Sequence, residues 1–381
     1  MKKRILAILL SSVLALSLLA CAADDTSKDD ANTDASTEDT SKDDAATPAG
    51  DLHFEVIVKS FQSTYWQAAV IGVKNACDEL GVTANCNGPA TESDIADQIQ
   101  MLDSAIESKP AGIGLAACDT NSVLDSLAKA KEAGIPVVCF DTGVADAPEG
   151  SVYATVATDN AAAGACAATN MFPVIEAKVK AATVASPVRI GEVNQDATAL
   201  NIQQRGQGFI DEMVKLCTEA GKKVAVVGND FFVNNTEGVV AEAEAEVIIE
   251  VAVPANTTVE NSSIEAQNIM QKADTIAIFG SNQTTAEGVV TANQVLNVLS
   301  SNPEEGIIAA VFDAGAPQKA AITAGQLIGS VTQSPLMMGY DCIQTLVKIA
   351  NGESVQDIPM DGYWYNTENM EDDLIAPNLY D

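Results

Sequence analysis

The sequence predicts an α/β protein built as two doubly wound, parallel-sheet lobes. From residue 52 onward, short apolar runs alternate with amphipathic stretches, which is typical of strands followed by helices. Helices between successive strands require right-handed crossovers, so the strands pair in parallel. The alternation begins again at Val188. Two blocks of similar size fit two lobes better than one very wide sheet.

The first block contains four predicted strands and three predicted helices. The strands are expected at 54–58, 82–86, 112–116 and 136–140. The helices are expected at 65–80, 95–106 and 122–133. Gly81 and Gly134 follow two of these helices. Glycine commonly ends a helix because it adopts the left-handed conformation without strain.

The second block repeats the alternation with more strands. These are expected at 188–193, 224–227, 247–253, 275–279, 307–312 and 327–331. A helix is expected at 197–220, ending at Gly221. Residues 222–247 read as additional material within this block, and the sequence leaves their role open.

The N-terminus reads as an export signal over residues 1–21. Three basic residues precede an apolar run that is too short for a comfortable membrane span. The run ends in Leu18-Leu19-Ala20-Cys21, which resembles the bacterial lipobox and implies lipidation of Cys21. Two acyl chains would anchor the protein stably to the membrane. The alternative is an ordinary secretory signal with an incidental cysteine.

Residues 22–50 have a composition that cannot support a packed core. They hold nine acidic residues, and the segment at 25–31 recurs at 39–45. We predict a disordered acidic linker that holds the folded part away from the membrane. An acidic metal-binding loop is the alternative, but the spacing lacks an EF-hand pattern.

The overall composition excludes several kinds of chemistry. A net charge of −33 argues against a nucleic-acid ligand, because phosphate binding needs clustered Lys and Arg. His53 is the only histidine, so no paired-histidine zinc site or Ser-His-Asp triad can form elsewhere. We therefore predict no metal site, no cofactor and no enzymatic activity.

The cysteines show no metal-binding or redox motif. No CxxC pair occurs among the eight cysteines. Cys77 with Cys86, or Cys118 with Cys139, could form a disulfide, and the sequence does not decide between these pairs and free thiols. Reduced cysteines are the default expectation.

Polar side chains follow the predicted strands of both blocks. Ligands of open α/β sheets bind beyond the carboxyl ends of the strands, so these residues are the candidate binding site. They are Ser63, Tyr65, Trp66, Asp141, Thr142, Asn282, Asp313 and Gln333, together with Arg205 in the first helix of the second block.

This set of side chains suits a sugar. Each sugar hydroxyl both donates and accepts, so carboxylates, amides and one guanidinium can satisfy it. The apolar C–H face of a sugar ring packs against aromatic rings such as those of Tyr65 and Trp66. Alternatively, Asp and Asn after strands act only as turn formers or helix caps.

From residue 52 onward the chain resembles the ribose- and galactose-type periplasmic binding proteins. The segments that carry the resemblance are 59–66, 139–142, 157–160, 205–209, 279–282, 312–315 and 331–334. The resemblance implies two lobes joined by three crossing strands that close around one sugar. It assigns residues 51–158 plus about 334–357 to the N-terminal lobe, and 159–333 plus about 358–381 to the C-terminal lobe.

Two departures from the family pattern bear on the ligand. Ser63-Thr64-Tyr65-Trp66 stands where an Asn-Pro-Phe-Phe-like pattern is usual, and Thr142 stands where an arginine often follows the aspartate. These changes put ribose itself in doubt and leave other sugars open. Related sugar-responsive repressors carry DNA-binding helices, which residues 1–50 lack.

The resemblance implies an extracytoplasmic, lipid-anchored and monomeric solute-binding protein. It would capture a pentose or hexose and deliver it to the permease of an ABC importer. Three alternatives remain open: a receptor that passes a sugar-like signal to a membrane sensor, a nucleoside-binding protein, and a glycosidase using Asp141 and Asp313.

Overall fold

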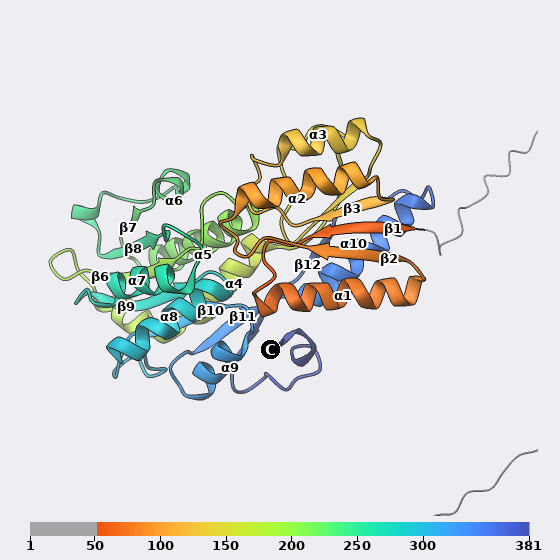
Figure 1. The fold of residues 1–381 in the computed structure, drawn as a ribbon. Helices are drawn as coiled ribbons and strands as arrows, with labels where there is room; N and C mark the ends of the chain where they lie inside the picture. The colour runs from red at the N-terminus through yellow and green to blue at the C-terminus, as the bar shows by residue number, and fades with distance from the viewer. Residues whose placement is uncertain (1–51, 381) are drawn as a thin grey trace, which may run out of the picture. The chain divides into compact units, whose positions relative to one another are not determined.

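The computed structural model describes residues 52–380. The predicted export signal, the lipidation site at Cys21 and the acidic linker lie outside the described residues. No helix among residues 52–380 combines the length and apolar character that a membrane crossing needs. These residues contain two mainly parallel sheets with helices on both faces of each, which confirms the predicted fold class (Figure 1).

The first sheet has the strand order β12-β5-β4-β3-β1-β2, and all of its pairings are parallel. Its strands are β1 His53–Ile57, β2 Thr83–Asn87, β3 Gly112–Leu115, β4 Val137–Phe140, β5 Val152–Thr158 and β12 Ile358–Met360. The central strands β3 and β4 are buried at every position. Such continuous apolar runs are expected where helices cover both faces of a parallel sheet.

Four helices cover this sheet: α1 Thr64–Leu80, α2 Ile95–Ser108, α3 Leu124–Glu132 and α10 Pro335–Ala350. The pair α1 and α10 packs on one face and the pair α2 and α3 on the other. A Cβ on Gly72 would lie only 1.8 Å from the Leu336 carbonyl oxygen, so α1 and α10 meet backbone to backbone. We call this sheet and its helices the first lobe.

The second sheet has the order β13-β11-β10-β9-β6-β8-β7. Its strands are β6 Val188–Val193, β7 Val224–Gly228, β8 Val247–Ala252, β9 Thr275–Gly280, β10 Ile308–Phe312, β11 Gly329–Thr332 and β13 Tyr363–Tyr365. Only β13 runs antiparallel to its neighbour. Residues 222–247 are not additional material, because they hold the edge strand β7 and its connection to β8 through α6 Asp230–Asn235 and the short helix η2 Glu242–Glu244.

The remaining long helices cover the second sheet and form the second lobe with it. They are α4 Asn160–Ala181 and α5 Leu200–Glu219 on one face, and α7 Val259–Met270, α8 Gln283–Leu296 and α9 Ala316–Thr323 on the other. Glycine again allows close helix contact, since a Cβ on Gly164 would lie 2.0 Å from the Arg205 carbonyl oxygen. This contact fixes α5, which carries Arg205, against α4.

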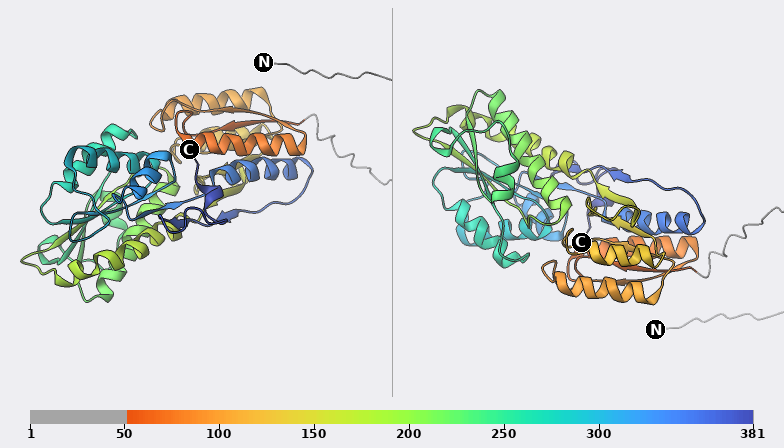
Figure 2. Two further views of the ribbon diagram at one scale, coloured as in Figure 1. Left: turned by 90° about the horizontal axis from the view of Figure 1, so that it is seen from below. Right: turned by 90° about the horizontal axis from the view of Figure 1, so that it is seen from above.

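The chain crosses between the two sheets three times. The crossings lie between β5 and α4, between β11 and α10, and between β12 and β13. The third crossing follows Met360, because β12 pairs with β5 in the first sheet. The predicted boundary at about residue 358 falls at the start of β12. The final segment, with η3 Ala376–Asn378, returns to the junction of the lobes, where Ser334 and Thr332 contact Asn378 (Figure 2).

Candidate functional site

Two aspartates adopt left-handed backbone conformations at corresponding places in the two sheets. Asp141 follows β4 with φ of 62°, and Asp313 follows β10 with φ of 70°. Each backbone N–H donates to the next strand, Asp141 to the Val156 carbonyl at 2.9 Å and Asp313 to the Val331 carbonyl at 2.7 Å. Among residues other than glycine, Asp and Asn adopt this conformation most readily.

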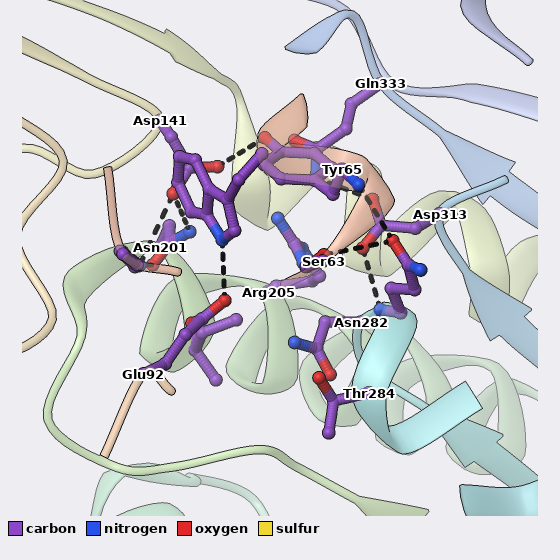
Figure 3. Close-up of a pocket in the computed structure, with 14 residues that line it drawn as sticks. Ser63, Tyr65, Glu92, Asp141, Asn201, Arg205, Asn282, Thr284, Asp313 and Gln333 are labelled. Atoms are coloured by element: carbon purple, nitrogen blue, oxygen red, sulfur yellow. Dashed lines mark hydrogen bonds and ion pairs between the residues drawn. The ribbon is translucent and has the colours of Figure 1, made fainter. Parts of the chain in front are cut away.

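Both carboxylates face one pocket between the lobes, whose cavity volume is about 20 Å³ in this structure (Figure 3). Its lining residues are Lys59, Ser63, Tyr65, Trp66, Glu92, Asp141, Asn201, Ile202, Arg205, Asn282, Gln283, Thr284, Asp313 and Gln333. The structure thus brings together every predicted site residue except Thr142. The hydroxyl of Thr142, fully buried, donates to Asp141 Oδ2 at 2.8 Å, so Thr142 supports the pocket without lining it.

Asp141 is held by four side-chain donors. Tyr65 Oη donates to Oδ1 at 2.5 Å, and Asn201 Nδ2 donates to Oδ2 at 2.8 Å. The Lys59 ammonium lies 3.3 Å from Oδ2, and Thr142 completes the set. Burial, followed by the charge and hydrogen bond of Asp141, raises the pKa of Tyr65 well above its ordinary value. Tyr65 therefore stays a hydrogen-bond donor.

Asp313 is the corresponding acceptor from the second lobe. It accepts from Gln333 Nε2 and from the backbone N–H of Gln283, both at 2.8 Å. Burial raises the pKa of Asp313 to about 6, against the opposing effect of the Arg205 charge. The carboxylate therefore titrates close to physiological pH.

Arg205 is fixed by the second lobe and is only 1% exposed. Its Nε and Nη2 donate to Asn160 Oδ1 at 3.2 and 2.7 Å, and Nη1 donates to the Ser281 carbonyl at 2.9 Å. The guanidinium carbon lies 3.7 Å from the centre of the Phe312 ring, a favourable cation–π distance. These contacts leave a charged donor already oriented in the pocket wall.

The aromatic pair of the pocket is well buried. The rings of Tyr65 and Trp66 pack edge to face, with centroids 4.9 Å apart, and Trp66 is 2% exposed. Trp66 Nε1 donates to Glu92 Oε1 at 2.8 Å. The pair therefore offers apolar ring surface while the polar atoms of both rings are already bonded.

The prediction missed Lys59, Glu92, Asn201 and Gln283. Three of them carried a usable signal. Lys59 lies two residues beyond β1, Asn201 lies four residues before Arg205 on the same face of α5, and Gln283 follows Asn282 directly. Glu92 lies in the loop before α2, where no periodic pattern marks it.

Side chains of the two lobes bond to each other around the pocket. Gln283 Nε2 donates to Thr64 Oγ1 at 2.9 Å, and Ser93 and Thr257 share a hydroxyl hydrogen bond of 2.8 Å. Lys59 Nζ donates to Asn201 Oδ1 at 3.1 Å. The lobes are therefore closed on one another in this structure.

The described residues offer little for metal or thiol chemistry. Within residues 52–380 no three His, Cys, Asp or Glu side chains gather as metal ligands. The seven cysteines of this range are free thiols, so neither of the two candidate disulfides is formed. His53 lies on β1, where its ring contacts Thr83 and Glu55 rather than the pocket.

Residues 54–354 match the model of the periplasmic binding protein domain family. The chain belongs to that family. The match spans both lobes and all of the strand-end loops that build the pocket. No curated protein sequence is significantly similar to this periplasmic binding protein.

Solved structures share the fold over nearly their full length. A protein of Brachyspira murdochii, described as an ABC transporter and LacI-family transcriptional regulator, is 28% identical, with a TM-score of 0.72 and coverage of 87% of this chain and 99% of that one. An ABC transporter solute-binding protein of Agrobacterium vitis with bound D-fucose is 26% identical, with a TM-score of 0.69 and coverage of 86% and 100%. The glucose-galactose binding protein GanP of Geobacillus stearothermophilus, 21% identical with a TM-score of 0.67 and coverage of 84% and 99%, shares the fold.

Proposed function

We propose that this periplasmic binding protein captures a monosaccharide, a pentose or a hexose, in the pocket between its lobes. One observation carries the proposal: Asp141 and Asp313, in matching left-handed conformations at strand ends, reach the same pocket from opposite lobes.

The pocket chemistry supports a polyhydroxylated ligand. The two carboxylates accept hydrogen bonds from hydroxyls, while Arg205 and the amides of Asn282 and Gln333 donate to them. A hydroxyl left without a partner would cost about 1–3 kcal/mol, which gives the site its selectivity. The solute-binding protein of A. vitis, 26% identical, holds D-fucose, a ligand of this class.

The proposed mechanism is closure without chemical reaction. A ligand that contacts both lobes favours the closed state by its extra affinity for that state. The lobes would act as two domains that hinge at the three crossings. The closed form then docks on the permease of an ABC importer.

The site of action in this proposal is outside the cytoplasmic membrane. The lipobox-like ending at Cys21 would supply the anchor and residues 22–50 the spacer. We expect the protein to act as a monomer. Mass spectrometry of the mature N-terminus tests the anchor, because lipidation adds the mass of the acyl groups to Cys21.

A calorimetric screen of pentoses, hexoses, nucleosides and glycosides tests the function. We expect saturable binding of a pentose or hexose without turnover, and loss of that binding in Asp313→Asn. The exposed Asp125→Asn on α3 serves as the matched control, since it removes one carboxylate far from the pocket lining. Hydrolysis of a glycoside, or binding confined to nucleosides, would refute the proposal.

A further inference from the structure

The pocket contains more negative than positive charges. Its lining holds three carboxylates, Glu92, Asp141 and Asp313, but only two cations, Lys59 and Arg205. The two cations also serve different parts of the pocket, because Arg205 lies with Asp313 and Lys59 lies 3.3 Å from Asp141. The excess negative charge is therefore confined to one part of the pocket.

That excess lies on the side of Lys59. Burial opposes the charged form of Lys59, yet the negative charges of Asp141, Glu92 and Asp196 raise its pKa above the ordinary value. Of these three carboxylates, Asp141 and Glu92 line the pocket, so one ammonium group stands against two pocket carboxylates on this side. A further carboxylate brought by a ligand would be repelled, whereas a second cation would be attracted.

Glu92 is the pocket carboxylate whose hydrogen-bond partners among the described residues are all neutral, and burial raises its pKa above the ordinary value against the opposing effect of the Lys59 charge. Its Oε1 accepts from Trp66 Nε1 and its Oε2 accepts from Gln195 Nε2, each at 2.8 Å. Both donors are neutral, and Glu92 forms no ion pair within 4.0 Å in the part of the chain that the structure describes. A carboxylate has about four lone-pair sites, so acceptor capacity remains.

Glu92 also forms part of the wall that the pocket shares with a wider groove between the lobes. The groove lining includes Thr91, Thr257, Glu260 and Glu287, and among its described lining residues there is no Lys, Arg or His. The polar side chains of this groove are therefore hydroxyls, amides and carboxylates. Such a lining favours neutral and cationic ligand groups over anionic ones.

We infer that the pocket prefers an amino sugar, whose ammonium group is bound by Glu92, over the parent sugar and over the corresponding uronate. The inference rests on the proposed sugar-binding function and specifies its ligand class. A hydrogen bond between ammonium and carboxylate is about twice as strong as one between neutral groups. We therefore expect a preference of about tenfold for the amine over the parent hydroxyl compound.

Matched ligand triples test this preference by calorimetry at about pH 7. The probes are D-glucosamine, D-glucose and D-glucuronate, and the equivalent set of D-galactosamine, D-galactose and D-galacturonate. In at least one triple we expect the amine to bind about ten times more tightly than the parent, with the uronate weakest. A parent sugar that binds as tightly as its amine, or more tightly, would overturn the inference.

Two variants connect the preference to Glu92. Glu92→Gln should reduce the ratio of amine to parent affinity to about one, whereas Glu260→Gln, an exposed carboxylate of the same groove, should leave the tenfold ratio intact. An unchanged ratio in Glu92→Gln would contradict the inference. If neutral pentoses or hexoses bind while no amine outranks its parent, only this inference fails. If no sugar binds at all, the proposed function fails with it.

Discussion

Replacing Asp141 by Asn should destabilise the fold as well as the site. Asparagine tolerates the left-handed backbone about as well as aspartate, so the change tests the carboxylate and not the φ angle of 62°. It removes the only carboxylate within 4.0 Å of the Lys59 ammonium among the described residues, and Lys59 is 1% exposed. Breaking a buried pair in this way costs about 3–5 kcal/mol.

The expected loss lies near the lower end of that range. Asn201 Oδ1 still accepts from Lys59 at 3.1 Å, so we expect about 3 kcal/mol of unfolding free energy to be lost. Adding Lys59→Met removes the unpaired charge and should restore most of that stability, although neither variant should bind the sugar. Urea unfolding followed by tryptophan fluorescence measures both effects. An Asp141→Asn variant within about 0.5 kcal/mol of wild type, or a double variant no more stable than the single one, would refute the reasoning.

Three further predictions follow from groups in the second lobe. Because the pKa of Asp313 is raised to about 6, sugar affinity should fall as the pH drops below about 6, and calorimetry from pH 5 to 8 measures this. Glu192 is fully buried, and burial raises its pKa well above the ordinary value. Its stabilising contribution is therefore complete at low pH and is lost as the pH rises above the unfolded pKa, by up to about 1.4 kcal/mol of unfolding free energy per pH unit. In thermal unfolding, Glu192→Gln should make the stability less dependent on pH. Tyr380 Oη accepts from the Ala314 N–H at 3.3 Å, and the Tyr380 ring packs against Tyr65, so Tyr380→Phe should cost about 1 kcal/mol of stability and weaken sugar binding.

Each of these predictions has a control. Asp313→Asn should remove the pH dependence of affinity together with most of the binding, and a wild-type affinity that is flat from pH 5 to 8 would contradict the role of Asp313. Glu219→Gln, exposed at the end of α5, should keep the wild-type dependence of stability on pH. For Tyr380→Phe, an unchanged affinity and melting temperature would show that the final segment does not support the pocket.

The sequence predicted most of the strands because their apolar runs are short and bounded by clear breaks. β6 lies at the predicted residues, and the strand ends supplied seven pocket residues, Thr142 being the exception. Arg205, the eighth, came from the predicted helix. α4 was not predicted. Its first half is rich in Ala and Gly, so no stripe of large apolar residues marks the face that packs closely on α5. A helix whose contact surface is backbone leaves little signal in a hydrophobic pattern.

The parts of the site that could not be predicted depend on distances between separate segments. Glu92 belongs to a loop in the first lobe, and only the fold brings it to Gln195 of the second lobe at 2.8 Å. Buried polar groups without partners are equally hard to predict from the sequence. The position of Glu192 in a predicted strand suggests an ordinary surface residue, but both of its carboxylate oxygens are buried and lack a hydrogen-bond partner among the described residues. Register and burial, which decide such cases, are properties of the assembled sheet.

The backbone angles at Asp141 and Asp313 restrict how this scaffold can acquire new ligands. At a positive φ, only Asp, Asn and Gly are readily accommodated. Each of these positions can therefore carry a carboxylate that only accepts hydrogen bonds, an amide that both donates and accepts, or no side chain. If substitutions changed the ligand specificity to another sugar, these two positions would therefore still be Asp, Asn or Gly. Most of the diversity must then arise at neighbours on ordinary backbone, such as Ser63, Glu92 and Gln333, which are free to vary in size and charge.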